Sequence, residues 1–395
     1  MILRPRRVVS VAHSYCVGLN RRLAHEMARV QPSRWEVTAV APPTFHGDLR
    51  RIALEDIAAE ACGLEIVPVH VDRPIHAMFY GRRLREVLRA SWDVVHCWEE
   101  PYVLAGSQVA TWSPRDAALV FTTAQNILKR YPPPFSWLER YAMRRADAWI
   151  AVGHGVAETL GARDAYAALP YRVIPLGVDT ARFRPDAHAR ARTLRELGWT
   201  EADVPVVGFV GRFVPEKGLP LLMRTLDATA SLPWHGIIMG GGPLSAALDA
   251  WARRHPGRVH IATDVPHERM PSYLSAMDIL CAPSQTTPRW REQLGRMLLE
   301  AFASGVAVIG SDSGEIPRVL GDAGVVVGER DDAGWVRALS ALLQDPERRA
   351  ELGAKGRARA HDVFAWPVVA RQHLALFDSL LEHRHAAGAP EVMHA

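Results

Sequence analysis

Short apolar runs alternate with amphipathic stretches along most of the 395 residues of this chain. The runs are rich in Val and Ile, which is typical of strands buried on both faces of a sheet. In the first half we expect strands at 8–12, 35–41, 64–69, 93–97, 118–122 and 148–152. Helical patterns lie between several of them, at 19–30, 81–90 and 137–145. This alternation predicts right-handed crossovers and a parallel sheet covered by helices on both faces.

The same pattern starts again near residue 204, after a short strand, turn residues at 172–179 and a polar helix at 187–197. The second set of predicted strands is 206–210, 236–239, 259–262, 279–282, 306–309 and 324–327. The helices that alternate with them are 220–230, 244–254, 297–303 and 331–343. We therefore expect an α/β protein of two doubly wound units, 1–178 and 179–365. A last helix at 366–383 has no strand after it, so the pattern alone lets it close either unit.

The composition is that of a globular protein, with 48% hydrophobic and 23% charged residues, and it excludes a disordered or fibrous chain. No run approaches the ~20 apolar residues of a membrane span. The basic start, residues 1–7, leads into a stretch interrupted by Ser10, His13 and Ser14, which favours a strand over a secretory signal. The four cysteines are far apart, so we expect neither a disulfide framework nor a zinc site, and a cytoplasmic location.

Positive charge is concentrated in the first 175 residues, which hold 22 Lys and Arg against 17 Asp and Glu, while the remainder holds 25 against 26. Two basic, aromatic stretches, 73–89 and 129–145, have the composition of a surface that lies on an anionic membrane. Glu86, Glu139 and Asp147 interrupt them, which favours an ordinary solvated helix face. The net charge of +4 and the lack of a recognised motif argue against a nucleic-acid partner.

The segment 210–218 is a candidate phosphate-binding loop. A predicted strand ends at Gly211, which permits a close backbone approach, and Gly218 opens the next helix. Between them Arg212 and Lys217, one of three lysines in the chain, can converge on one anion such as a diphosphate. A solvated basic loop is the alternative. No Gly-Lys-Ser/Thr follows, which excludes a Walker A loop, and no Gly-x-Gly-x-x-Gly follows the first strand, which argues against a nicotinamide site.

A second candidate segment, 292–300, follows the predicted strand at 279–282. Gly295, Arg296 and Met297 should form the start of a helix, whose first amides can bind phosphate oxygens. Glu300, about one turn inside, can accept hydrogen bonds from ribose hydroxyls, and Glu292 would face the other end of a nucleotide ligand. Taken singly, either glutamate is explained as well by a capping or helix-dipole role.

These segments together resemble the retaining glycosyltransferases of the GT-B fold, glycosyltransferase family 4. The matching text is 173–179, 211–218, the glycines 240–242, the pair Glu292 and Glu300, 300–305 and 310–317. The resemblance covers nearly the whole chain. It implies two Rossmann-like domains that face each other across a cleft, with the nucleotide sugar held by the second. It also implies that the last helix returns to the first domain, so that 366–395 complete 1–178.

The resemblance also implies roles for individual residues. Arg212 and Lys217 would bind the donor diphosphate, Glu300 the ribose and Glu292 the donor sugar, which makes Glu292, Arg212 and Lys217 the catalytic candidates. The donor-binding set on this basis is Gly211, Arg212, Lys217, Glu292, Gly295, Arg296, Met297 and Glu300. The family is thought to need no metal or other cofactor for the transfer itself. A donor phosphate oxygen would take the acceptor proton, and protein help would be chiefly positioning and electrostatics.

The first half departs from the family pattern. Many relatives place a histidine where this chain has Gln125, and since Gln cannot titrate we expect it to hydrogen-bond the donor sugar rather than act as a base. Glu100, at another strand end, is a candidate contact for sugar or acceptor hydroxyls. Gly18 is a weaker candidate of the same kind. His13, His96 and His154 also lie near strand ends, where a histidine is more often structural.

We therefore expect a retaining glycosyltransferase that moves a sugar from a UDP- or GDP-sugar to a hydroxyl of a sugar, lipid-linked or other acceptor. Glycan, polysaccharide or glycolipid assembly is the expected context, in the cytoplasm or on the inner membrane face. One alternative is a nucleotide-sugar epimerase or hydrolase of the same fold, which would turn over without an acceptor. Another is a non-catalytic sugar-nucleotide-binding subunit, which would not need Arg212, Lys217, Glu292 and Glu300 intact.

Overall fold

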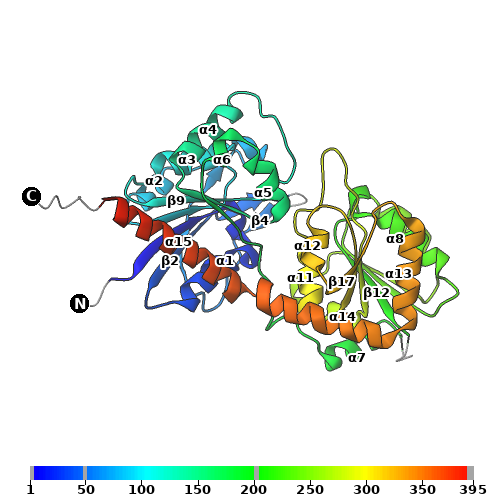
Figure 1. The fold of residues 1–395 in the computed structure, drawn as a ribbon. Helices are drawn as coiled ribbons and strands as arrows, with labels where there is room; N and C mark the ends of the chain where they lie inside the picture. Colours follow the sequence, from blue (N-terminus) through cyan, green and yellow to red (C-terminus); the bar gives the residue numbers. More distant parts are fainter. Residues whose placement is uncertain (1–3, 48–50, 200–203, 389–395) are drawn as a thin grey trace, which may run out of the picture. The chain divides into compact units, whose positions relative to one another are not determined.

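The computed structural model describes residues 4–47, 51–199 and 204–388. The chain divides into two compact units (Figure 1), one formed by residues 1–175 with 366–395 and the other by residues 176–365. The sequence predicted a domain boundary after residue 178 and a return of the chain to the first domain at residue 366. The ends of the predicted first domain, residues 1–3 and 389–395, lie outside the described residues.

The first unit contains a parallel sheet with the strand order β11-β10-β9-β8-β1-β2-β5. Its strands are β1 (Arg6–Val11), β2 (Trp35–Ala41), β5 (Gly63–Ile66), β8 (Val94–Cys97), β9 (Ala118–Thr123), β10 (Ala148–Ala151) and β11 (Tyr171–Val173). The helices before residue 176 are α1 (Gly18–Val30), α2 (Arg83–Leu88), α3 (Leu104–Trp112), α4 (Phe135–Arg145), α5 (His154–Gly161) and α6 (Asp164–Ala167). Two small antiparallel pairs, β3 (Thr44–His46) with β4 (Arg51–Ala53) and β6 (Val69–His70) with β7 (Phe79–Tyr80), stand apart from this sheet.

Strand β1 lies inside the first sheet, between β8 and β2. Val8, Val9 and Val11 have no exposed surface, as expected for a strand with helices over both faces. The chain passes from β1 to β2 and β5 on one side and returns to β8 on the other side. The predicted strand at 64–69 is divided, because Pro68 has no N–H to donate to a ladder and the chain leaves the sheet there.

Helix α15 (Trp366–Gly388) belongs to the first unit and packs along α1 (Figure 1), so the predicted return of the last helix is confirmed. Trp366, Val369 and Phe377 lie in the same apolar core as the inner residues of β1 and β2. Asp378 forms ion pairs with Arg6 and with Arg34, the latter at 2.8 Å. The apolar face therefore fixes the helix on this unit, and the ion pairs add local support.

The second unit contains a parallel sheet with the strand order β14-β13-β12-β15-β16-β17. Its strands are β12 (Val206–Val210), β13 (His235–Met239), β14 (Val259–Ala262), β15 (Ile279–Ala282), β16 (Ala307–Ser311) and β17 (Gly324–Val327). Its helices include α7 (Ala187–Glu196), α8 (Leu219–Ala228), α9 (Ser245–Ala252), α10 (Met270–Ala276), α11 (Arg296–Ala303), α12 (Ile316–Leu320), α13 (Asp332–Gln344) and α14 (Pro346–Arg359). The predicted doubly wound α/β architecture is confirmed in both units.

The strand order places a topological switch point between β12 and β15. The chain passes from β12 to β13 and β14 on one side, and then crosses to β15 on the other side of β12. The connections that leave the carboxyl ends of β12 and β15 therefore run to opposite sides, and such a switch point is where parallel sheets usually bind their ligands. Segment 210–218 leaves the end of β12, and segment 292–300 comprises the last part of the connection after β15 and the start of α11.

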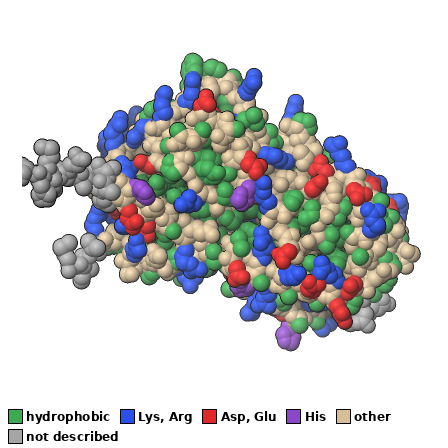
Figure 2. Space-filling view, viewed as in Figure 1, with side chains coloured by type: hydrophobic (Ala, Val, Ile, Leu, Met, Phe, Trp, Pro, Cys, Tyr) green, Lys and Arg blue, Asp and Glu red, His purple; other side chains and the backbone are tan. Residues whose placement is uncertain are grey.

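Basic and acidic side chains are intermixed on the face drawn in Figure 2. In the first basic stretch Arg83 pairs with Glu65 at 2.7 Å. In the second, Glu139 is buried and pairs with Arg163, so it does not interrupt a solvated face. On α4 and the loop before it Leu128 and Trp137 are exposed, at 66% and 58%. Within the described residues no helix combines the length and apolar character that a membrane span requires.

Candidate functional site

The loop after β12 is held tightly against the end of β15. Gly218 has φ +74°, and a Cβ atom added to it would lie 1.7 Å from the carbonyl oxygen of Pro283. Only glycine fits this backbone conformation and this approach. The short turn Pro215–Lys217 is thereby pressed toward the segment that follows β15, and α8 begins directly after it.

This packing brings Lys217 and Glu292, 75 residues apart, into direct contact. Lys217 Nζ donates to Glu292 Oε2 at 2.6 Å, and Ser284 Oγ donates to the same oxygen at 3.0 Å. The Lys217 ammonium also lies 5.0 Å from the centroid of the Trp290 ring. Both charged side chains are largely buried, with exposed fractions of 13% for Lys217 and 8% for Glu292. The sequence predicted both residues as donor ligands but not their contact with each other.

The loop after β16 fixes the backbone on the other side of Glu292. The carbonyl oxygen of Glu292 accepts from Glu315 N at 3.1 Å. A Cβ atom on Gly314, which has φ +59°, would lie 2.0 Å from that oxygen. Ser311 Oγ donates to the carbonyl of Ser284 at 2.6 Å and ties the same two loops together. Segment 310–317 matched the family pattern in the sequence, but its contact with the backbone of Glu292 was not predicted.

Helix α11 begins after Gly295, a left-handed residue with φ +77° that supplies no capping side chain. Arg296 is partly buried; burial lowers the pKa of its guanidinium, and the Glu300 carboxylate opposes that shift. Met297 packs against the apolar core of the unit. Glu300 is buried, and its Oε1 lies 3.5 Å from His267 Nε2. His267 was not singled out in the sequence, because it comes from the loop after β14 and no motif marks it.

The glycines after β13 line the loop that carries Arg212. Phe213 N donates to the carbonyl of Gly241 at 2.8 Å. A Cβ atom on Gly240 would lie 1.9 Å from the carbonyl oxygen of Gly211, and one on Gly242 would lie 2.7 Å from that of Phe213. At Gly241, in contrast, an added Cβ would meet no atom within 4 Å. The loop thus supports the Gly211–Phe213 backbone and leaves open space at Gly241.

In the first unit Glu100 and Gln125 contact each other. The Glu100 carboxylate accepts from Thr123 Oγ1 at 2.6 Å, from Ala124 N at 2.9 Å and from Gln125 Nε2 at 3.1 Å. Burial raises the pKa of Glu100, and these three hydrogen bonds oppose the shift. Tyr131 donates to the side-chain oxygen of Gln125. Both predicted residues therefore lie at the carboxyl ends of β8 and β9, where Glu100 orients Gln125.

The remaining candidates of the first unit have separate environments. The backbone amide of Gly18 donates to Glu55 Oε2 at 2.7 Å. His96 is buried between Ser10 Oγ and Thr122 Oγ1, each 2.7 Å away, and burial lowers its pKa well below the usual value. It is therefore a neutral residue of the sheet interior and not part of a site. His154 is exposed at the start of α5.

His13, a weaker candidate of the sequence, forms a pair with a residue that the sequence did not single out. His13, after β1, and Glu99, after β8, form an ion pair in which Nδ1 of His13 lies 2.6 Å from Glu99 Oε2. The OH of Tyr80 donates to Glu99 Oε1 at 2.5 Å. Glu99 was not singled out in the sequence, because two adjacent glutamates at a strand end cannot be told apart until the neighbouring strand is known.

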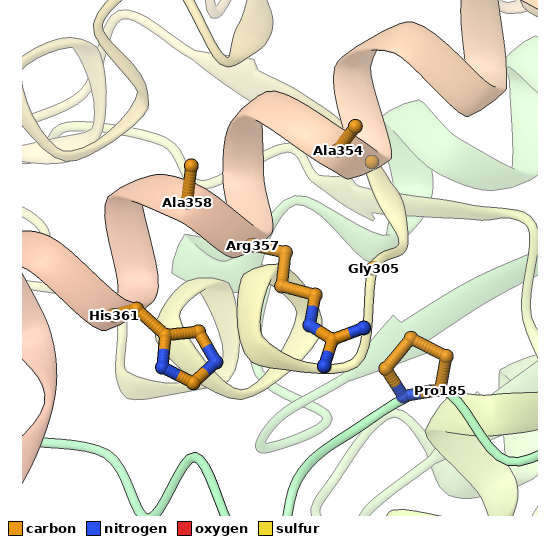
Figure 3. Close-up of a pocket in the computed structure, with 7 residues that line it drawn as sticks. Pro185, Gly305, Ala354, Arg357, Ala358 and His361 are labelled. Atoms are coloured by element: carbon orange, nitrogen blue, oxygen red, sulfur yellow. The ribbon is translucent and has the colours of Figure 1, made fainter.

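A surface pocket lies elsewhere on the second unit (Figure 3). It is lined by Pro185, Gly305, Gly353, Ala354, Arg357, Ala358 and His361. The figure shows Arg357 of α14 pointing toward Pro185. Gly305 leads into the amino end of β16, so this pocket lies on the side of the amino ends of the strands, opposite the carboxyl ends from which the candidate segments leave. It contains none of the predicted donor residues. Within the described residues no group of three or more His, Cys, Asp or Glu side chains is placed to hold a metal ion.

Comparison with known proteins places both units in one family. The family model described as Glycosyl transferases group 1 matches residues 204–345, and that of Glycosyltransferase Family 4 matches residues 21–182, so that together they cover most of the chain. Several relatives are mycobacterial proteins. The GDP-mannose-dependent alpha-(1-6)-phosphatidylinositol monomannoside mannosyltransferase of Mycolicibacterium smegmatis is 34% identical over 54% of this chain. Alpha-maltose-1-phosphate synthase of the same organism is 32% identical over 61% of the chain. These matches span 57% and 65% of the two relatives. The mannosyltransferase of Mycobacterium tuberculosis is 28% identical over 89% of this chain and 92% of its own.

Solved structures agree on the fold. Sucrose-phosphate synthase from Thermosynechococcus elongatus superposes with a TM-score of 0.71 at 21% identity, covering 96% of this chain and 100% of that one. Anabaena HepE in complex with UDP and glucose superposes with a TM-score of 0.68 at 17% identity, covering 95% and 100%. At these identities the likeness concerns the fold alone. From the two family models, the relatives and the shared GT-B fold, we conclude that the chain belongs to the group 1, family 4 glycosyltransferases.

Proposed function

We propose that the protein transfers a sugar, with retention of its anomeric configuration, from a nucleotide diphosphate sugar to a hydroxyl of an acceptor. The observation that carries this proposal is the contact between Lys217 and Glu292 at the switch point of β12 and β15. A cation there can bind the donor diphosphate, and a carboxylate beside it can bind the sugar hydroxyls. Helix α11 begins in the same segment and adds the positive end of its dipole.

The chemical help expected from Lys217 and Arg212 is electrostatic. When the glycosidic bond breaks, negative charge grows on the leaving diphosphate, and two cations beside it would stabilise that charge more than they stabilise the bound donor. Lys217 donates to Glu292 in the structure, so the donor must share or replace that contact. Ser284 remains as a second donor to Glu292, which keeps the carboxylate in place while it turns to the sugar.

The relatives suggest which donor to try first. Two of them are named GDP-mannose-dependent mannosyltransferases. We therefore propose GDP-mannose as the first donor and UDP-sugars as the second choice. Glu300 is the proposed ribose ligand, and His267, 3.5 Å from it, is placed to orient its carboxylate.

A lipid-linked acceptor, and a role in glycan or glycolipid assembly, is the biological context that we propose. The relatives' names include a phosphatidylinositol mannoside. On this chain Leu128, Lys129, Trp137, Arg140 and Arg144 are all exposed on α4 and the loop before it. An apolar and cationic face of this kind suits the surface of an anionic membrane.

The transfer is proposed to proceed without a metal ion, because the protein cations offset the leaving diphosphate. We further propose that a donor phosphate oxygen takes the proton of the acceptor hydroxyl, since Gln125 cannot titrate. Gln125, oriented by Glu100 and Tyr131, would instead hydrogen-bond a substrate hydroxyl. The contribution of the protein is then positioning of the two substrates together with electrostatic stabilisation.

A donor and acceptor screen tests this proposal. The purified protein is titrated with GDP, UDP and ADP by calorimetry, and each tight-binding nucleotide is then supplied as its sugar conjugate with a panel of acceptors. We expect release of nucleoside diphosphate that depends on the acceptor. Turnover without any acceptor would instead indicate a hydrolase or epimerase. Nucleotide binding without turnover on any acceptor would indicate a non-catalytic subunit.

A further inference from the structure

The first sheet also has a switch point, between β1 and β8. The chain leaves β1 toward β2 and β5, and later returns to β8 on the opposite side of β1. Register pairs Val11 with Cys97 at the carboxyl ends of the two strands. The loops that follow diverge, as at the donor site, and His13 and Glu99 are their first charged or titratable side chains.

Glu99 holds His13 through both carboxylate oxygens. Glu99 Oε1 accepts from the backbone N of His13 at 2.5 Å, and Oε2 lies 2.6 Å from Nδ1 of the ring. Tyr80 OH adds a third donor at 2.5 Å. The Glu99 side chain is 1% exposed and that of His13 is 22% exposed. A buried carboxylate with three donors therefore supports an imidazole that reaches solvent.

This geometry leaves one ring nitrogen of His13 for another molecule. Nδ1 is engaged by Glu99, while Nε2 has no hydrogen-bond partner among the described residues. The Phe45 ring, with its centroid 4.4 Å from that of His13, covers part of the imidazole. In carboxylate–histidine pairs of this kind, the carboxylate fixes the orientation and tautomer of the ring and raises the basicity of the outer nitrogen.

The titratable groups around this pair support the same arrangement. Burial disfavours the charged imidazole, but the Glu99 carboxylate outweighs it, so the pKa of His13 is raised. Burial, and then Glu99, raise the pKa of Tyr80 well above its usual value, so its OH remains a donor. Behind them, burial also raises the pKa values of Tyr15 and Cys97, which leaves both neutral. Glu99 is thus the charged group that faces His13.

The charges nearby indicate what kind of group the outer nitrogen meets. Helix α1 starts a few residues after His13, and its first amide, at Gly18, would be a natural partner for a phosphate. Glu55 already fills that position with its own carboxylate, 2.7 Å from the amide. Two carboxylates, Glu55 and Glu99, therefore flank this loop, and they repel an anion. A neutral hydroxyl can both donate to and accept from an imidazole, and it carries no such cost.

We propose that His13 is an acceptor-binding residue whose Nε2 hydrogen-bonds a hydroxyl of a neutral sugar or cyclitol ring, with Glu99 and Tyr80 as positioning residues. The inference rests on the proposed function, since only a transferase has an acceptor. On this proposal the loops after β1 and β8 bind the ring that carries the reacting hydroxyl. A phosphate group on the same acceptor would bind at another place.

The first test does not depend on activity. Protein labelled with ¹⁵N-histidine is titrated with methyl α-D-mannopyranoside and myo-inositol, and in parallel with mannose 6-phosphate and D-inositol 3-phosphate. The His13 signals are those that disappear in His13→Gln. We expect the Nε2 signal to move with at least one neutral ring and to move less with its phosphorylated partner. No movement with any of the four, or a larger movement with the phosphates, would overturn the proposal.

The second test uses the transfer reaction, with the acceptor that the screen identifies. His13→Gln and Glu99→Gln should lower kcat/KM for the acceptor by about tenfold or more, the loss of one hydrogen bond to a polarised group. Both should bind GDP or UDP as the wild type does, because the donor residues lie in the other unit. Glu65→Gln, which removes an exposed pair with Arg83, is the matched control and should change neither quantity.

The outcomes separate the two proposals. Wild-type protein that binds no nucleoside diphosphate would refute the proposed function. Intact nucleotide binding and transfer, with unchanged acceptor kinetics in His13→Gln, would refute only the inference about His13. The pH profile adds a check against a merely structural role. Glu99→Gln should lower the pKa that governs acceptor kcat/KM, because it removes the charge that raises the pKa of His13.

Discussion

Replacing Lys217 with methionine separates the catalytic role of this residue from its structural role. The change keeps most of the apolar stem of the side chain and removes the ammonium. It deprives Glu292 of the donor at 2.6 Å and leaves Ser284, at 3.0 Å, as a donor to that carboxylate oxygen. It also removes one of the two proposed cations on the leaving diphosphate. We therefore expect losses of both stability and activity.

The two losses have different sizes. Removing one partner of a buried ion pair typically costs 3–5 kcal/mol, because the other charge is left unpaired. Glu292 keeps a hydrogen bond and both side chains retain some exposure, so we expect a fall of about 2 kcal/mol in the free energy of unfolding. Loss of a preorganised group that stabilises developing charge lowers kcat by roughly 10²- to 10³-fold.

The double variant Lys217→Met/Glu292→Gln is the control. Both charges are then absent, so chemical denaturation should show most of the lost stability restored, while acceptor-dependent turnover stays at the low level. A double variant that regains both stability and activity would show that the pair only supports the fold. Turnover in Lys217→Met equal to that of the wild type would refute the assignment of Lys217 to the diphosphate.

Three further predictions concern the loops, the last helix and the surface. Gly218→Ala should lower the Tm by several degrees and abolish nucleotide binding, since a Cβ would meet a carbonyl oxygen at 1.7 Å, whereas Gly241→Ala, with open space at its Cβ, should leave the Tm unchanged. Burial lowers the pKa of His373 from 6.5 to about 4, so this residue alone should cost about 3 kcal/mol of stability as the pH drops from 6.5 to 4. Burial lowers the pKa of the neighbouring His96 as well, so His373→Phe should make the fall in denaturation curves less steep without abolishing it. Sedimentation with anionic vesicles at low salt should pull down the wild type and much less of Trp137→Ser, and equal sedimentation of both would remove this face of α4 from the account.

Much of the fold could be predicted because local signals agree with it. The runs at 35–41 and 206–210 are apolar, β-branched and bounded by turn residues, and they are strands β2 and β12 with those bounds. Helix α3 was missed because Gly106 and Ser107 interrupt its pattern and its residues are mostly buried, which leaves no polar face to mark the period. Helix α14 was missed because it is polar on most sides, although Asp345 followed by Pro346 is a recognisable helix start.

The candidate site, too, could be predicted from the sequence only in part. The positions of Gly211 at a strand end and of Gly295 at a helix start followed from the local pattern. The contact between Lys217 and Glu292 could not be predicted locally, since it depends on β15 lying beside β12 although β13 and β14 intervene in sequence. Sheet order is set by long-range packing. The contact between Glu99 and His13 could not be predicted for the same reason, because it depends on β8 lying beside β1.

The most direct test of the central claim is the linkage formed by the wild-type protein, measured by NMR on the product of GDP-mannose, or of the sugar nucleotide that binds most tightly, with an acceptor from the screen. We predict that nucleoside diphosphate is released only when acceptor is present, that an α-linked donor gives an α-linked product, and that Lys217→Met forms this product at least about 100-fold more slowly. A β-linked product, or no acceptor-dependent release with any donor that binds, would contradict this prediction.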